Sequence, residues 1–346
     1  MRIGIVGYGA RSSLANLFHD PERGTAVTAV CDPSPARRDL AREHFGEGLL
    51  TCSELVTLLE SDVDAVVISS PDYLHAPQAI AALTAGKAVY VEKPLATTVE
   101  QADAVLEAAE VSGSLLFVGH NMRYMPVIET LKKAIDDGLI GAVKSIWCRH
   151  FVGHGGDFFF RDWHADRTKV NSLLLQKGVH DLDVLNYLSD SEPARVSAFG
   201  NQTVYLPNPD HRAPAGFEHD PDSFLINWPP AERRDLAAVI DVEDLNIVNL
   251  QMRNGVLATY QQCHYTPDYW RSYTVIGDRG RLENFGDGPG SRVKIWNQRV
   301  VGYADQPDIE LLVHHPVGDH AGADPRIVAA FLAAYRSGDP GAGNGH

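Results

Sequence analysis

The chain has 346 residues, of which 44% are hydrophobic and 22% are charged, so its composition excludes disordered and fibrous classes of protein. Because a single hydrophobic core stops growing at roughly 250–300 residues, this length predicts two domains. Thirty basic and 45 acidic residues give a formal net charge of −15. Such a charge would repel a phosphate backbone or an anionic membrane, which argues against nucleic-acid and membrane partners.

The N-terminal sequence MRIGIVGYGA has no hydrophobic signal segment or cleavage site, and no apolar run of about 18 residues follows it. We therefore expect a cytoplasmic protein that does not span a membrane. The four cysteines lie far apart and form no CxxC pair, which predicts reduced thiols. They are Cys31, Cys52, Cys148 and Cys263.

The first 120 residues alternate short apolar runs with longer amphipathic runs, a pattern that predicts parallel strands joined by crossover helices. Strands are expected at RIGIV, TAVTAVC, DAVVISS, AVYVE and SLLFVG. Helices are expected at PARRDLAREHF, APQAIAALTAG and TVEQADAVLEAAEVSG, the last of which has Gly113 as its C-cap. The order predicts an α/β fold, with a doubly wound parallel sheet forming a dinucleotide-binding Rossmann domain at residues 1–122.

The segment PVIETLKKAIDDGLIG is typical of one more helix, and the pattern of the sequence changes after it. Long β-rich segments follow, at AVKSIWCRHF, NIVNLQMRNGVLATYQQC and RSYTVIGDRGRLEN, and the turn signals RNG and DRG predict hairpins. These segments predict a second, α+β domain at residues 123–346 with a mainly antiparallel sheet. Residues 206–240 are expected to form a surface excursion, DPRIVAAFLAAYRSG a late helix, and DPGAGNGH a ragged end.

The segment GIVGYGARSS places two glycines directly after the first predicted strand, with Ser12 where a third glycine is usual. Gly7 would permit the tight turn, Gly9 would let the backbone approach a pyrophosphate, and the next helix would offer its N–H groups. Asp32, 25 residues after Gly7, ends the second strand and could bind a ribose hydroxyl. The alternative is a turn that uses glycine for geometry alone, but the carboxylate favours a dinucleotide site.

The same carboxylate bears on the choice of cofactor. Asp32 would repel the 2′-phosphate of NADP, so the sequence favours NAD. Arg37 and Arg38 keep NADP open, because a nearby guanidinium could pair with that phosphate, although arginines on a helix surface are more often solvated.

Polar residues follow the third and fourth predicted strands, in SSPDYLH and EKP. Carboxyl ends of parallel strands form the edge at which open α/β sheets bind ligands. We therefore expect Lys93 to face a nicotinamide ring. The alternative is that Pro71 and Pro94 only end the strands and that the lysine is solvated.

Taken together, these motifs resemble the Gfo/Idh/MocA family of nicotinamide-dependent oxidoreductases, which act mostly on sugars, inositols and their derivatives. The resemblance covers nearly the whole chain and rests on GIVGYGARSS, SSPDYLHAPQAIAALTAGKAVYVEKPLATT, GHNMRY and GVHDLDVLNYL. It implies a large open sheet in a substrate-binding and oligomerisation domain, and therefore a homodimer or homotetramer. It also implies that Lys93 lies beside the reacting carbinol and that the Lys93–Pro94 bond is cis.

The resemblance implies a set of site residues. Lys93 and His180 would be catalytic. The expected cofactor-binding residues are Gly7, Gly9, Ser12, Asp32, Ser70, Pro71, His75, Glu92, Lys93 and Asn121. The expected substrate-binding residues are Lys93, Trp163, Gln176, His180 and Asp183. The indole of Trp163 could offer an apolar platform to a sugar ring, although a tryptophan in a loop can equally be part of a core.

Gln176 is a departure from the family pattern, which has an aspartate four residues before the histidine. An amide can donate and accept hydrogen bonds but cannot hold a counter-charge for an imidazolium. The proton route is therefore open between two schemes: His180 takes the proton, or Lys93 does.

The predicted function is reversible, NAD-dependent oxidation of a secondary hydroxyl on a sugar, an inositol or a sugar derivative. One alternative is an NAD-dependent glycosidase that oxidises its substrate transiently, and a second is a non-catalytic regulator that binds NAD or NADP. A carbohydrate or polyol is the expected partner, and no metal is expected. Two histidine groups have no recognised ligand spacing: His150 with His154, and His315 with Asp319 and His320.

Overall fold

The structure, a computed structural model, describes residues 1–207, 236–314 and 319–339. Most of the predicted surface excursion and most of the expected ragged end lie outside these residues, and so does His315. The side chains of Asp319 and His320 are not described either. The chain divides into two compact units, Met1–His120 with the segment from Asp324 onward, and Asn121–Ala323.

The first unit contains a six-stranded parallel sheet in the order β3-β2-β1-β4-β5-β6. Its strands are β1 (Arg2–Val6), β2 (Ala26–Cys31), β3 (Leu50–Cys52), β4 (Ala65–Ile68), β5 (Ala88–Val91) and β6 (Leu116–Val118). The central strands β4 and β5 are buried along their whole length, as expected for a sheet covered on both faces. The doubly wound parallel sheet predicted from the sequence is confirmed.

The helices of this unit begin and end largely where local signals predict. They are α1 (Ser12–Leu17), η1 (Pro21–Arg23), α2 (Pro35–Phe45), α3 (Leu55–Leu59), α4 (Asp72–Thr84), α5 (Val99–Ser112) and α10 (Ala323–Ser337). Helix α5 ends at Gly113, which has the left-handed conformation of a C-cap (φ 64°). Helix α4 begins four residues before the predicted start, because Pro77 lies inside the helix rather than in its first turn.

One domain assignment made from the sequence is corrected. Residues 324–339 were expected in the second domain, but they group with the first unit. The cause is aromatic packing: the ring of Phe331 on α10 lies 5.8 Å from the rings of Phe18, Tyr90 and Phe117, measured between centroids. Burial of such large rings stabilises the attachment of α10 to the first unit.

The second unit contains an eight-stranded sheet in the order β14-β13-β12-β11-β7-β10-β9-β8. The strands are β7 (Val143–Phe151), β8 (Pro193–Asn201), β9 (Leu245–Met252), β10 (Leu257–Cys263), β11 (Trp270–Gly277), β12 (Arg281–Phe285), β13 (Arg292–Trp296) and β14 (Ile309–Leu312). Only β7 and β10 pair in parallel, and the two predicted hairpins join β9 to β10 and β11 to β12. The mainly antiparallel second sheet is therefore confirmed.

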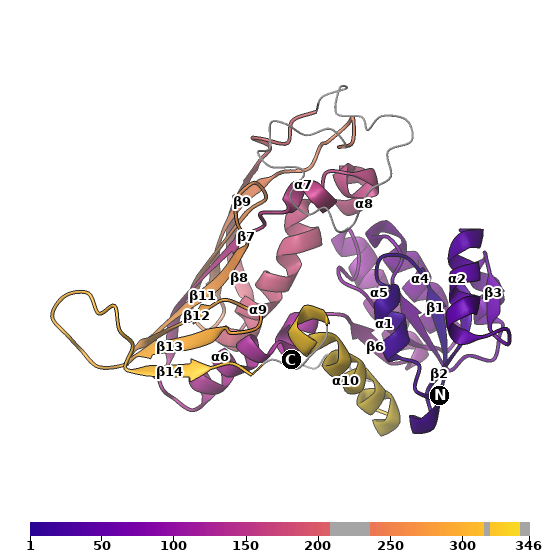
Figure 1. Ribbon diagram of the computed structural model, residues 1–346, viewed down its shortest axis with the longest axis horizontal. Helices are drawn as coiled ribbons and strands as arrows, with labels where there is room; N and C mark the ends of the chain where they lie inside the picture. Colours follow the sequence, from indigo (N-terminus) through magenta and orange to yellow (C-terminus); the bar gives the residue numbers. More distant parts are fainter. Residues whose placement is uncertain (208–235, 315–318, 340–346) are drawn as a thin grey trace. The chain divides into compact units, whose positions relative to one another are not determined.

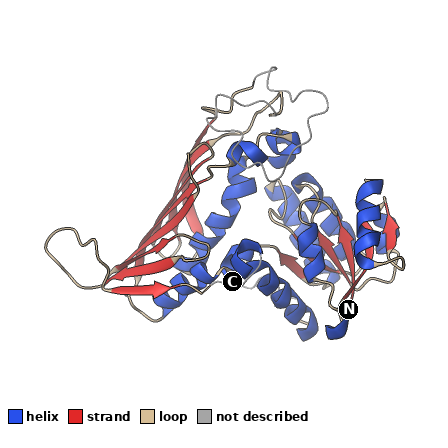
Figure 2. Ribbon diagram, viewed as in Figure 1, coloured by secondary structure: helices blue, strands red, loops and turns tan. Residues whose placement is uncertain are grey.

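Helices α6 and α9 lie along one face of this sheet (Figure 1). The other face carries no helix of the described residues (Figure 2), and large apolar side chains such as Trp147 and Phe199 are 50% and 72% exposed. The helices of the unit are η2 (Asn121–Tyr124), α6 (Pro126–Asp136), α7 (Gly155–Phe158), η3 (Asp162–Ala165), α8 (Arg167–Val170), η4 (Leu174–Gly178), α9 (Val179–Ser189) and η7 (Asp319–Gly322). No described helix has the length and hydropathy to cross a membrane.

Candidate functional site

The glycine turn after β1 requires glycine at its first position. The N–H of Gly7 donates to the carbonyl of Cys31 at 2.9 Å, and φ at Gly7 is +86°. A Cβ at this position would lie 2.8 Å from the backbone nitrogen of Ser70. Gly7 is therefore fixed by both conformation and packing, and the turn closes as the N–H of Ser12 donates to the carbonyl of Gly9 at 3.0 Å.

Gly9 is different, because neither its conformation nor its surroundings within the protein require glycine. Its φ is outside the left-handed region, and a Cβ built on it would meet no atom within 4 Å. The open space in front of this backbone is where a ligand can approach closely. This fits the role of the second glycine in a dinucleotide site, where the backbone lies against a pyrophosphate.

Asp32 directly follows β2, and its carboxylate is buried and held at both oxygens. Oδ2 accepts from the N–H of Tyr8 and Oδ1 accepts from the N–H of Ser34, each at 2.8 Å. Each carboxylate oxygen can still accept another hydrogen bond, so this group fits a ribose diol. Arg38 lies nearby, but its Nη1 donates to the carbonyls of Asp32 and Pro33 at 2.7 and 3.0 Å.

The ends of β4 and β5 are tied together by a buried histidine. The ring nitrogens of His75 lie 2.7 Å from the carbonyl of Pro94 and 2.8 Å from the carbonyl of Ser70. The Lys93–Pro94 peptide bond is cis, as the resemblance implied. His75 thus links the segments PDYLH and EKP, although His75 and Pro94 are 19 residues apart in the sequence. Together the two segments form one edge of the sheet, and the half-buried Lys93 lies on it.

In the second unit, the predicted Gln176 and His180 lie at the junction of two helix types. Gln176 is in the π-helix η4 and His180 is in the first turn of α9, and both are buried. A π-helical turn is uncommon and occurs frequently at functional sites, because it redirects side chains within a helix. This geometry supports a functional role for the segment that sequence reasoning selected.

Asp183, one turn further along α9, is bound by an arginine. Nε and Nη2 of Arg123 donate to the two carboxylate oxygens at 2.8 and 2.7 Å, a bidentate pair that joins the GHNMRY motif to α9. Burial alone would lower the pKa of Arg123, but Asp183 outweighs it and raises that pKa. The pair gives Asp183 a structural task besides the substrate contact predicted for it.

Asp181 is the centre of a buried polar cluster that sequence reasoning missed. It accepts from the hydroxyls of Tyr260 (3.0 Å) and Tyr273, lies 3.0 Å from Nδ1 of His150, and lies 3.1 Å from Nε of Arg271. Burial would raise the pKa of Asp181, but Arg271 and then His150 outweigh it and hold that pKa below its usual range. The cluster anchors the first turn of α9, next to His180, to strands β7, β10 and β11.

The same cluster keeps His150 neutral. Burial, followed by the charge of Arg271, lowers the pKa of His150 to about 3. A neutral imidazole whose Nδ1 donates to Asp181 satisfies the carboxylate without adding a charge. His150 is therefore a neutral part of the buried core of the second unit. In the described residues no group of three or more His, Cys, Asp or Glu side chains is arranged to hold a metal ion.

Trp163 lies in η3 and is partly buried. Its ring stacks on His164 with a centroid distance of 3.8 Å, and it packs against the buried cluster around Phe160 and Val170. One face of the indole is thus covered by the neighbouring imidazole. Asn121, predicted to bind the cofactor, is buried in η2 and groups with the second unit.

Two models of protein families match this chain. The model of an oxidoreductase family with an NAD-binding Rossmann fold, Gfo/Idh/MocA, matches residues 1–120, and that of its C-terminal domain matches residues 128–283. The chain belongs to the Gfo/Idh/MocA family. The glycine turn, Asp32 and the Lys93 edge lie in the first match, and η4 and α9 in the second.

Two of the curated relatives are similar over part of their length. An inositol 2-dehydrogenase/D-chiro-inositol 3-dehydrogenase of Halalkalibacterium halodurans is 30% identical over 200 residues, 57% of this chain and 55% of that protein. A 2,7-anhydro-N-acetylneuraminate hydratase of Mediterraneibacter gnavus is 28% identical over 236 residues, 66% of this chain and 58% of that protein. The chain thus spans a little over half the length of each relative. The solved structure of a levoglucosan dehydrogenase with NADH and levoglucosan superposes with a TM-score of 0.77 over 99% of this chain and 93% of that one, at 19% identity, and shows the shared fold.

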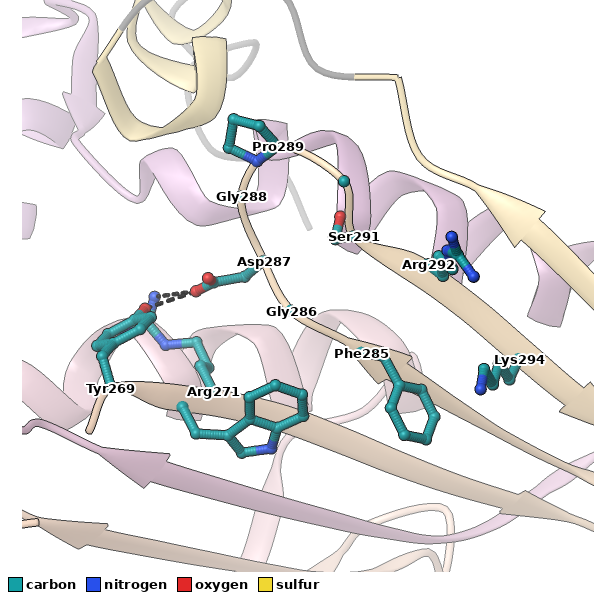
Figure 3. A pocket seen from close by; sticks show the side chains of 12 residues that line it. Tyr269, Arg271, Phe285, Gly286, Asp287, Gly288, Pro289, Ser291, Arg292 and Lys294 are labelled. Atoms are coloured by element: carbon teal, nitrogen blue, oxygen red, sulfur yellow. Dashed lines mark hydrogen bonds and ion pairs between the residues drawn. The ribbon is translucent and has the colours of Figure 1, made fainter. Parts of the chain in front are cut away.

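A separate pocket of about 530 Å³ lies beside the start of β11 and the β12–β13 turn (Figure 3). Arg271 lines it together with Asp287, whose Oδ2 lies 3.5 Å from Nη1 and accepts from the hydroxyl of Tyr269 at 2.5 Å. None of the site residues predicted from the Gfo/Idh/MocA resemblance lines this pocket. The two charged groups that face each other in it are paired, and Arg271 also belongs to the Asp181 cluster.

The structure thus distributes the predicted site residues of this Gfo/Idh/MocA protein over two units. In the first unit it brings Gly7, Asp32, Ser70 and Lys93 to strand ends of one parallel sheet. His75, in the first turn of α4, lies against the carbonyls of Ser70 and Pro94. Beyond these, the geometry adds Asp181 with Arg271 in the second unit. The only sequence signal for this pair was an acidic residue next to His180.

Proposed function

We propose that the protein is an NAD-dependent dehydrogenase that reversibly oxidises a secondary hydroxyl of a sugar, an inositol or a sugar derivative. One observation carries this proposal: three features meet at one edge of the parallel sheet. They are the open space at Gly9, the Asp32 carboxylate held by backbone N–H groups, and Lys93 on a strand end that His75 links to its neighbour. Membership of the family and the name of the inositol dehydrogenase relative support the substrate class.

The residues fit a nicotinamide dinucleotide. The Gly7–Ser12 turn would hold the pyrophosphate, Asp32 would bind the ribose hydroxyls, and Ser70, Pro71 and Glu92 would line the nicotinamide end. When bound, NAD supplies a ring that accepts a hydride from the substrate carbon. Asp32 favours NAD over NADP because a carboxylate repels a 2′-phosphate, and the described hydrogen bonds of Arg38 go to backbone carbonyls.

The chain's own residues would manage the hydroxyl proton. As the carbon gives up its hydride, the hydroxyl oxygen must lose its proton, because otherwise a high-energy, positively charged protonated carbonyl would remain. When the proton leaves ahead of the hydride, the oxygen becomes an alkoxide. We assign the proton to His180 and the stabilisation of the developing alkoxide to Lys93, whose ammonium is a suitable point charge. Gln176 would hydrogen-bond a substrate hydroxyl, since an amide cannot supply the counter-charge of the usual family aspartate. Asp183, held by Arg123, would keep the His180 helix in position.

A redox-neutral reaction is the second candidate, and the hydratase named among the relatives favours it. In such a cycle the substrate is oxidised, undergoes elimination and addition, and is reduced again, so no NADH accumulates. The NAD-dependent glycosidase predicted as an alternative belongs to this class. The same turn, Lys93 and His180 would serve its first step.

We also propose that the protein forms a homodimer or homotetramer through the helix-free face of the eight-stranded sheet. Trp147, Leu257 and Phe199 on that sheet are 50%, 56% and 72% exposed, and an apolar face of this kind on an isolated chain indicates an interaction surface. Burial of these side chains against a second copy would remove the apolar surface from water.

The test is a screen of cyclic polyols, sugars, uronic acids and aryl glycosides in which NADH absorbance and product release are followed together. Net NADH formation that depends on the substrate supports the dehydrogenase. Product release with no net NADH but with a requirement for NAD supports the redox-neutral candidate. Reaction of neither kind across the panel, with NADH binding intact, would remove both.

A further inference from the structure

Arg11 lies inside the glycine turn, yet its described side-chain bonds all go to carboxylates. Nε and Nη2 donate to Oε1 of Glu92 at 3.1 and 2.9 Å, and Nη1 donates to Oδ2 of Asp324 at 3.0 Å. Glu92 begins the EKP segment, and Asp324 lies in the first turn of α10. One guanidinium therefore joins the glycine turn, the strand end that carries Lys93, and the C-terminal helix, all within the first unit.

The electrostatics explain why an arginine is needed there. The side chains of Glu92 and Asp324 are 9% and 1% exposed, so their charges are removed from water. Burial alone would lower the pKa of Arg11, but Glu92 and Asp324 outweigh it and raise that pKa above its usual value. Because buried carboxylates without a partner are strongly destabilising, the single guanidinium stabilises both of them in place.

Glu92 passes this constraint to Lys93. Its Oε1 receives both Arg11 bonds, while its Oε2 accepts from the backbone N–H of Lys93 at 3.3 Å. The carboxylate also lies against Gly119, where an added Cβ would approach Oε2 to 3.3 Å. Glu92 thus has one orientation, which Arg11 fixes from one side and the β6 end limits from the other.

We propose that Arg11 is a positioning residue that acts through Glu92 to hold Lys93 in its working orientation. Asp324 in turn holds Arg11, so helix α10 contributes to the positioning of Lys93. The proposal rests on the proposed role of Lys93. The competing interpretation is that Arg11 binds the cofactor phosphates directly, as its place in the glycine turn would suggest. The two interpretations differ in which measured constant changes.

The experiment compares Arg11→Met, Arg11→Lys and Asp324→Asn with Arg23→Met as the matched control. Arg23 is in an exposed ion pair with Asp20, with 85% of its side chain exposed and a separation of 3.6 Å. Three quantities are measured on each full-length variant: the NADH dissociation constant by fluorescence, the ¹³C resonance of reductively dimethylated Lys93, assigned with Lys93→Arg, and kcat with KM on a substrate that the screen identifies.

We expect Arg11→Met to lower kcat by roughly 10- to 100-fold, the range seen when a supporting partner of a functional group is removed. The NADH dissociation constant should stay within about threefold, and the Lys93 resonance should move. Asp324→Asn should move that resonance in the same direction by less, and Arg11→Lys should restore part of the effect, because one ammonium can reach one carboxylate. Arg23→Met should match the wild type.

A rise in the NADH dissociation constant with an unmoved Lys93 resonance and unchanged kcat would overturn the proposal in favour of a phosphate ligand. Wild-type values in all three measurements would overturn it as well. If Arg11→Met does not fold, the Lys93 resonance in Asp324→Asn and Arg11→Lys decides the matter. The Lys93 resonance is measured without substrate, so its displacement in the variants supports the positioning role even if the proposed reaction is not found. If the wild type is active and the resonance does not move in the variants, the positioning role is refuted while the proposed function stands.

Discussion

Replacement of Arg271 by Met tests the claim that the Asp181 cluster holds the first turn of α9 in place. Arg271 is 6% exposed and Asp181 is fully buried, so the variant leaves a carboxylate without its cation in the core. Removal of one partner of such a pair costs about 3–5 kcal/mol. Tyr260, Tyr273 and His150 would still face Asp181, so we place the loss of unfolding free energy near the lower end, about 3 kcal/mol.

Urea unfolding followed by tryptophan fluorescence measures this loss selectively. The four tryptophans that the structure describes all belong to the second unit, so their emission reports on that unit. They are Trp147, Trp163, Trp270 and Trp296. With a slope of about 2–3 kcal/mol per molar urea, the midpoint should fall by at least about 1 M. Arg292→Met is the control, because that ion pair with Glu310 is 53% and 37% exposed and should be worth at most about 1 kcal/mol. Equal midpoints for the two variants would refute the reasoning.

Three further predictions follow from named groups. The pKa of His150 is lowered by burial to about 3, so below pH 6.5 the unfolded chain takes up a proton that the folded chain does not. The second unit should therefore lose up to about 1.4 kcal/mol of stability per pH unit as pH falls from 6.5 toward 3, a loss measured as urea midpoints and reduced in His150→Gln. A pH-independent midpoint would contradict it. Asp32→Ser should raise kcat/KM for NADP relative to NAD at least tenfold, and an unchanged ratio would count against the ribose contact. Gly9→Val should weaken NADH binding about tenfold or more with no change in Tm, because the added side chain enters open space; a fall in Tm with unchanged binding would locate the defect in folding instead.

Local signals made the first unit predictable. Ser34 and Thr98 cap α2 and α5, Gly113 ends α5, and each of these is readable from neighbouring residues. Strand β3 escaped prediction because it has only three residues, with a threonine between a leucine and a cysteine. The second sheet was predictable in its two hairpins, whereas the parallel pairing of β7 with β10 joins segments more than 100 residues apart and leaves no local trace.

Some residues of the candidate site were likewise predictable from local sequence patterns, and others were not. Gly7, Asp32 and Lys93 lie at strand ends, so the strand pattern alone brings them to one edge. Arg11 bonds to partners 81 and 313 residues away, and Asp181 to partners on three different strands. Such pairings depend on tertiary packing, and composition and periodicity carry no information about them. The aromatic attachment of α10 to the first unit was missed for the same reason.

The central claim is that Lys93 serves the chemical step of an NAD-dependent oxidation and is not needed to hold the cofactor. The most direct measurement is the turnover of Lys93→Met at saturating NAD, made together with its NADH dissociation constant. We expect a fall in kcat of about 10²–10³-fold, the usual worth of a group that stabilises developing negative charge in the transition state, with NADH binding within about threefold of the wild type. Unchanged turnover, or a loss of NADH binding large enough to account for the loss of activity, would contradict the account.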